Sequence, residues 1–252
     1  MFIAQPSIAL ATADELISTL PESVIRRHAD FLECYVSIKQ HVQIRFGLWH
    51  DILATPLPQD TALYSYTTAI MRYARTVALS NIARLDEAEK EKELFYQAVK
   101  AVPPTRRVIN NSANDILMVA EQMMLGELAY HKGNYELAFD HLRRSIELDD
   151  NLEYDEPWGW MQPTRHALGA LLLEQGQVEE AEAIYRADLG LDDTLSRACQ
   201  HPSNVWSLQG LLECLERRGE TTEARLLRRD FEIAAARAEI PIQASCFCRQ
   251  SS

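Results

Sequence analysis

Glycine and proline are scarce in this chain, with 9 glycines and 10 prolines among 252 residues. A fold built from many short strands and tight turns needs more of both, whereas long stretches rich in Ala, Leu, Glu, Gln and Arg favour helices. Long hydrophobic runs are also missing, because no apolar stretch approaches the roughly 20 residues that cross a membrane. The first residues lack the basic start of a secretory signal peptide. We therefore expect an all-α, cytoplasmic protein without a membrane partner.

Positive charge is outnumbered, since 25 Lys and Arg residues face 37 Asp and Glu residues, for a formal net charge of -12. Binding to nucleic acid rests mainly on Lys and Arg that neutralise phosphates, so this balance argues against a nucleic-acid partner. Apolar residues make up 47% of the chain, which is enough for a continuous core and excludes disorder as the main state.

The cysteines are few, odd in number and scattered, which is unlike the disulfide framework of a small secreted domain. We expect all five to be reduced. Cys246 and Cys248 stand one residue apart, but two thiols hold a metal ion only with further ligands. The sequence therefore favours an interpretation of this pair as small apolar side chains packed against the last helix.

Three glycines reveal an internal repeat. Gly133, Gly176 and Gly219 lie 43 residues apart, and each is followed five positions later by an alanine. A glycine ends a helix well because it adopts a left-handed conformation without strain, and a small alanine lets two helices approach closely. The pattern predicts helix, tight turn and helix in each of the segments 119–152, 162–195 and 205–238.

Fainter helix pairs precede these repeats, over 22–55 with a turn at Gly47 and over 61–102 with Ala83 in the turn position. No composition change marks a domain boundary. We therefore expect residues 1–252 to form a single domain of about five stacked helix pairs.

The clearest repeats resemble the tetratricopeptide repeat family. Leu125-Gly126 and Leu168-Gly169 stand seven residues ahead of the turn glycine and match its small-residue signature, although the third repeat has Leu211-Leu212 instead. The family's unit is about 34 residues long, so roughly nine extra residues separate successive pairs here. More particularly, strings such as YDEPWGWMQPTRHALGALLLEQG, HPSNVWSLQGLLECL and SCFCR resemble the C-terminal half of a group of longer, functionally uncharacterised fungal and bacterial proteins of this family.

The resemblance implies a right-handed α-solenoid in which the first helix of each pair lines a concave groove. The groove would then be acidic and aromatic, and its candidate ligand-binding residues are Glu127, Tyr130, His131, His166, Trp206, Gln209 and Glu213. Such a surface suits a protein or peptide partner with a basic or basic-and-aromatic segment. We expect a binding scaffold of this kind, without cofactor or metal ion.

Two alternatives stay open. Glu127 and His131 lie one helical turn apart, and with His166 on a neighbouring helix they could form the site of a metal-assisted, oxidoreductase-like enzyme in a biosynthetic pathway. No HExxH motif and no cysteine-histidine cluster of zinc spacing supports this hypothesis. Self-association is the second alternative, because the first helix would expose apolar side chains such as Ile17, Leu20 and Val24.

The segment EYDEPWGWM between two repeats is rich in tryptophan and proline. Trp158 and Trp160 could stack a ligand over the groove, but Trp buries a large apolar area wherever it can. The sequence therefore favours a packing role, in which both indoles cover the ends of adjacent helices.

Overall fold

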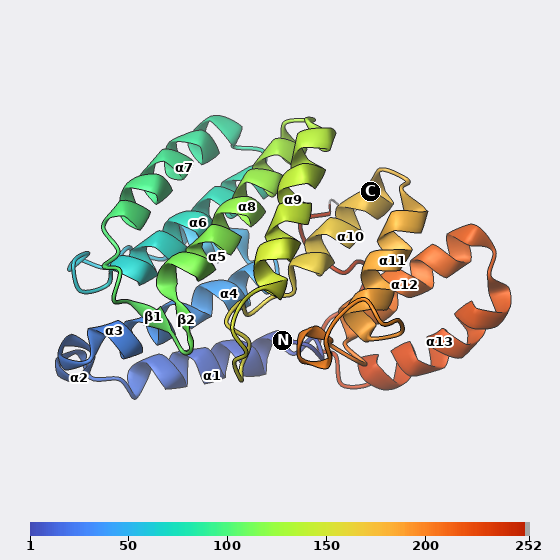
Figure 1. Cartoon of the computed structure of the whole chain (residues 1–252), viewed down its shortest axis with the longest axis horizontal. Coiled ribbons are helices and arrows are strands. Elements are labelled where there is room, and N and C mark those ends of the chain that lie inside the picture. Colours follow the sequence, from blue (N-terminus) through green and yellow to red (C-terminus); the bar gives the residue numbers. More distant parts are fainter. Residues whose placement is uncertain (250–252) are drawn as a thin grey trace. The chain divides into compact units, whose positions relative to one another are not determined.

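The computed structural model describes residues 1–249, and these are mostly helical (Figure 1). The first half contains α1 (Pro6–Ser18), α2 (Glu22–Arg27), α3 (Ala29–Leu32), η1 (Glu33–Ser37), α4 (Ile38–Arg45), α5 (Trp49–Ala54), α6 (Ser65–Asn81) and α7 (Leu85–Lys100). The second half contains α8 (Ala113–His131), α9 (Tyr135–Asp150), α10 (Thr164–Glu174), α11 (Val178–Leu189), η2 (Arg197–Cys199), α12 (Val205–Arg218) and α13 (Thr221–Ala235). Between them lies a hairpin of two-residue strands, β1 (Arg107–Val108) and β2 (Asn111–Ser112). The all-α prediction is confirmed.

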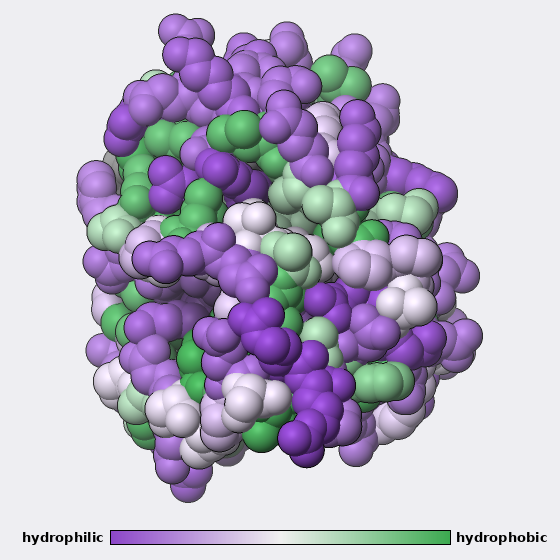
Figure 2. All heavy atoms as spheres, turned by 90° about the vertical axis from the view of Figure 1, so that its left-hand side faces the viewer, coloured by the Kyte–Doolittle hydropathy of each residue, from purple (hydrophilic) through white to green (hydrophobic). Residues whose placement is uncertain are grey.

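The chain divides into two compact units, each with its own buried side chains. The larger unit comprises residues 9–162, and the smaller unit comprises residues 1–8 together with the chain from Pro163 onward. Each unit is described by itself below. Figure 2 looks onto the face at the left of Figure 1, where hydrophilic side chains cover most of the surface and apolar ones appear in separate patches.

In the larger unit, α6 packs against α7 and α8, and α8 packs against α9. The predicted pair over 61–102 is confirmed as α6 and α7, joined through Ala83 at a φ of 60°. α8 and α9 approach closely at Gly126, one of the small residues of the family signature, because a Cβ there would come within 2.6 Å of the Leu142 side chain. Only a glycine leaves room for Leu142 at this point.

The predicted pair over 22–55 is present only in part: α4 and α5 flank the predicted turn at Gly47, whose φ is 64°, but the first predicted helix is broken into α2, α3, η1 and α4. A tertiary contact explains part of the break. The buried carboxylate of Glu33 accepts the backbone N–H groups of Tyr66 and Thr67 at 3.2 and 2.6 Å and so caps the start of α6. A charged cap of this kind stabilises a helix N-terminus, and it fixes Glu33 in a bend instead of a continuous helix.

In the smaller unit, α10, α11, α12 and α13 pack in chain order, and α10 also contacts α12. The turn glycines have the expected left-handed conformation, with φ values of 80° at Gly133 in the larger unit and of 75° and 74° at Gly176 and Gly219 here. Gly190 at φ 70° adds a stop that the sequence pattern did not predict, so α11 ends at Leu189. Helix termini otherwise follow the repeat pattern, except that α8 begins at Ala113, where Ser112 caps it by accepting the N–H of Asp115.

Candidate functional site

Three of the predicted groove residues lie on α8 of the larger unit. Glu127 is buried, and its carboxylate accepts a hydrogen bond of 2.9 Å from Asn81. Burial raises the pKa of Glu127 to about 7, against the effect of that hydrogen bond. Tyr130 is buried with its ring 4.9 Å from that of Tyr135, and burial lowers the pKa of His131 to about 4. Glu127 and Tyr130 are therefore interior groups, whereas His131 is half-buried and neutral at pH 7.

His166 belongs to a buried network around Asp188 in the smaller unit. The His166 Nε2 atom lies 3.0 Å from one carboxylate oxygen of Asp188, and the His201 Nδ1 atom lies 2.8 Å from the other. Asn204 and Ser207 donate to the first oxygen at 3.0 and 2.6 Å. Burial alone would raise the pKa of Asp188, but the two histidines and the hydrogen bonds hold it well below its usual value.

This network joins α10, α11, the loop after α11 and the first turn of α12. The Ser207 hydroxyl donates to the carboxylate itself and not to a histidine, so Asp188 does not act through an imidazole on a serine nucleophile. Every side chain in the network is buried or nearly so, and a buried carboxylate that accepts several charge-assisted hydrogen bonds fixes its surroundings firmly. The role of the network is therefore structural: its hydrogen bonds hold the loop after α11 in place.

The other predicted groove residues lie on α12, and two of them, Trp206 and Glu213, contact the segment Ser245–Arg249, called the seated segment below. Trp206 is 1% exposed, and its ring centroid lies 6.2 Å from that of Phe247. Glu213 receives two hydrogen bonds from Arg249, at 2.7 and 3.0 Å, and it also pairs with Arg217. Gln209, one turn from both, is half-buried. An aromatic side chain and an arginine of the same chain thus lie against this part of α12.

Two further contacts fix the seated segment. The Ser245 hydroxyl donates to the backbone carbonyl of His166 at 2.7 Å, and its oxygen lies 2.6 Å from the Tyr185 hydroxyl. The indole N–H of Trp206 donates to the carbonyl of Met1 at 3.0 Å. The indole is therefore covered by residues from two distant parts of the sequence.

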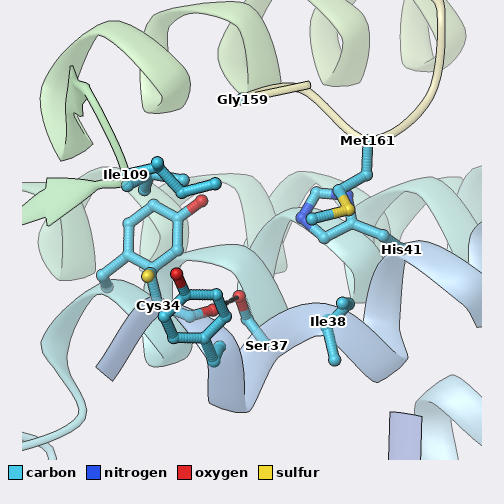
Figure 3. Close-up of a pocket in the computed structure, with 10 residues that line it drawn as sticks. Cys34, Ser37, Ile38, His41, Ile109, Gly159 and Met161 are labelled. Carbon is cyan, nitrogen blue, oxygen red and sulfur yellow. Dashed lines mark hydrogen bonds between the residues drawn. The ribbon is translucent and has the colours of Figure 1, made fainter. Parts of the chain in front are cut away.

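An internal pocket of the larger unit is drawn in Figure 3. Met161 points from the connecting loop toward the ring of His41, and Cys34, Ser37 and Ile109 line the other side. The cavity volume is about 20 Å³, and a water molecule needs roughly 10–15 Å³ of such space. Burial lowers the pKa of His41 to about 4, and its Nδ1 atom has no hydrogen-bond partner within residues 1–249. The pocket is too small for an organic substrate.

The tryptophan-rich connector borders the same region. Trp160 is buried, with its ring 5.2 Å from that of His41 and 5.5 Å from that of Tyr73, both in edge-on arrangements. The predicted packing role is confirmed for Trp160.

A larger hollow of about 270 Å³ lies between the loop after α11 and α13, lined by Leu191, Pro202, Leu227, Asp230 and Ile233 among others. Its rim is apolar, since Leu191 and Ile233 are exposed. It contains one carboxylate, that of Asp230, and no cluster of polar groups that would orient a substrate.

Sequence reasoning missed Asp188, Phe247 and Arg249. Asp188 lies seven residues after Ala181 and three after Tyr185, hence on the buried face of α11, and this spacing was a usable signal. The approach of Arg249 to Glu213 spans 36 residues, and no local pattern carries such a contact.

No protein-family model, curated protein or solved structure matches the chain. Within residues 1–249, no group of three or more His, Cys, Asp or Glu side chains has an arrangement that could hold a metal ion. None of the helices in this part of the chain combines the length and apolar character needed to span a bilayer.

Proposed function

We propose that the protein is a binding scaffold of tetratricopeptide-like helix pairs, and that the α12 surface of the smaller unit binds a peptide segment with an aromatic residue and an arginine. The seated segment carries this proposal, because it displays Phe247 against Trp206 and Arg249 on the carboxylate of Glu213. A planar guanidinium with two parallel hydrogen bonds to a carboxylate is a strong and geometrically selective contact. The chain's own residues thus exemplify the ligand chemistry that this surface accepts.

The helix pairs support the scaffold part of the proposal. Left-handed glycines at equal spacing end the first helix of each clear repeat, and successive helices pack in chain order within the smaller unit. Stacked helix pairs offer preformed surfaces, and a preformed surface binds a peptide without the cost of ordering itself.

A partner peptide would compete with the seated segment. The apparent affinity falls in proportion to the fraction of molecules whose surface is free, so a segment seated in nine molecules out of ten would weaken binding about tenfold. Loosening the segment should therefore strengthen binding, whereas removing the charge of Glu213 should weaken it. These opposite signs distinguish a binding surface from a purely structural contact.

The test begins with a peptide-display library panned on full-length protein carrying Arg249→Ala. Enriched peptides should combine an aromatic residue with Arg, and by fluorescence anisotropy they should bind this variant more tightly than the wild type. Adding Glu213→Gln should weaken binding by roughly tenfold or more, since a hydrogen bond to a charged group contributes about 1.5–3 kcal/mol.

Glu216→Gln is the matched control. Glu216 lies one turn further along α12 and pairs with Arg228 instead of the seated segment, so this change should leave peptide affinity unaltered. Enrichment of peptides without basic residues, or equal affinities for the proteins with and without Glu213→Gln, would refute the proposal.

A further inference from the structure

The seated segment contains two cysteines that are joined to each other. Cys246 and Cys248 form a disulfide across a single residue, Phe247, which corrects the expectation that all five cysteines are reduced. The remaining three, Cys34, Cys199 and Cys214, are free thiols.

This disulfide contributes little as a structural cross-link. The stabilisation that a disulfide provides by restricting the unfolded chain grows with the length of the loop that it closes, and here the sequence separation is 2. The segment is held instead by Ser245 on one side of the pair and by Arg249 on the other. Both anchors remain when the disulfide opens, so the pair can change its oxidation state without releasing the segment.

The two sulfurs differ in their surroundings. Cys248 is fully buried, whereas Cys246 is half-buried and is therefore the residue of the pair that solvent reaches. The backbone N–H of Cys248 donates to the Cys246 sulfur at 3.0 Å. A donor aimed at sulfur favours the thiolate, which is the nucleophile and the better leaving form in disulfide exchange. One accessible, hydrogen-bonded sulfur beside one buried partner is an arrangement suited to exchange.

We infer that Cys246 and Cys248 are a redox-active pair that oxidises a dithiol to its cyclic disulfide by thiol–disulfide exchange. A thiolate of the dithiol attacks the Cys246 sulfur, and the electron pair of the broken S–S bond goes to Cys248, which takes up the proton from the attacking thiol. The second thiol of the dithiol then attacks the first sulfur of the dithiol, which is bonded to Cys246 in the mixed disulfide. Cys246 leaves as a thiolate stabilised by the Cys248 N–H and takes the second proton, so two electrons and two protons pass from the dithiol to the pair.

The other cysteines serve as internal references. Burial raises the pKa of the Cys34 thiol to about 11 and that of the Cys214 thiol to about 12, so both are poor nucleophiles at neutral pH. Cys199 is half-buried like Cys246 but has no second sulfur beside it in the described part of the chain. Cys199→Ser is therefore the matched control.

The first measurement is a redox titration of the full-length protein against mixtures of reduced and oxidised dithiothreitol, followed by acid quenching, alkylation and mass spectrometry. Cys246 and Cys248 should become alkylated together in one two-electron transition, and Cys199→Ser should leave the midpoint unchanged. A pair that stays fully oxidised in reduced dithiothreitol under native conditions, or that does not re-form in the oxidised reagent, overturns the inference.

The second measurement separates the roles of the two sulfurs. In Cys248→Ser, Cys246 should form a mixed disulfide with a chromogenic aryl disulfide at least about tenfold faster than Cys248 does in Cys246→Ser, because the buried thiol reacts only after local opening. Equal rates in variants with wild-type circular dichroism overturn the assignment. Should either variant fail to fold, the titration of the wild-type protein decides alone. Neither readout involves peptide binding, so this inference and the proposed function fail independently.

Discussion

Tyr185 of α11 lies between two helical glycines of the smaller unit, and its packing can be tested with one methyl group. A Cβ added at Gly169 of α10 would lie 2.5 Å from the Tyr185 ring, and one added at Gly210 of α12 would lie 2.2 Å from it. Carbon atoms in contact are normally about 3.5–4.0 Å apart, so either methyl group overlaps the ring by about 1 Å or more. The ring is fully buried and its hydroxyl lies 2.6 Å from Ser245, which leaves it little room to move.

The expected cost combines two opposing effects. Alanine favours a helix over glycine by about 1 kcal/mol, whereas overpacking a well-filled core costs about 1–3 kcal/mol. With overlaps of this size we expect the upper end of that range, and therefore a net loss of about 2 kcal/mol for Gly169→Ala. In a chain of this length the midpoint of thermal unfolding should fall by about 4–8 °C.

Urea unfolding followed by circular dichroism measures this loss, and a second substitution tests its cause. In a Tyr185→Leu background the shorter side chain relieves the overlap, so Gly169→Ala should cost at least about 1 kcal/mol less than in the wild type. Gly176→Ala is a control for backbone strain alone, because nothing lies within 4 Å of its Cβ position and its φ is 75°. Equal effects of Gly169→Ala in both backgrounds would refute the reasoning.

Two further predictions concern pH. Burial raises the pKa of Glu127 to about 7, so the contribution of this carboxyl to stability is complete below the ordinary value of 4.5 and is lost as the pH rises through 7. Glu127→Gln should remove this loss. At pH 8 the variant should therefore unfold at a higher urea concentration than the wild type, with a free energy of unfolding larger by up to about 3 kcal/mol. The pKa of Asp188 is lowered, so its contribution is present above the ordinary value of 3.8 and is lost as the pH falls below it. Asp188→Asn should destabilise the protein by about 3–5 kcal/mol at pH 7 and flatten its acid unfolding profile, measured by the same method.

Local sequence patterns predicted those helix pairs whose turns and close contacts depend on the residue type at a single position. The three turn glycines, Ala83 in its turn and the small residues of α8 and α10 all lie where the repeat spacing put them, because a left-handed φ or a close helix contact admits few residue types. The turn at Gly47 was predicted in this way, but the breaks between α2 and α4 could not be. These breaks depend on Glu33, which caps a helix that begins more than 30 residues later.

The candidate site was predictable in part. Trp206 and Glu213 were named as groove residues because the family resemblance places the first helix of each pair in a groove, and the expected basic and aromatic ligand followed from the character of that groove. The sequence could not show that Phe247 and Arg249 of the same chain meet them, because pairing across tens of residues leaves no periodic signal. Asp188 is a different case: its spacing from Ala181 and Tyr185 indicates the buried face of α11, but its closeness to Asp192 and Asp193 favours an interpretation as solvated surface.

The seated segment links the proposed peptide-binding surface to the disulfide of Cys246 and Cys248. A segment tethered to its own binding surface competes at a high effective concentration, so even a weak contact remains formed until a partner offers stronger ones. Its rigid core is the two-residue step from Cys246 to Cys248, and oxidation restricts the directions in which Phe247 and Arg249 can point. Reduction should therefore add conformational freedom to the segment and lower its advantage over a partner. The library-selected peptide should accordingly bind the reduced wild-type protein more tightly than the oxidised one. Arg249→Ala, in which the segment has already lost its contact with Glu213, should show a smaller difference between the two states.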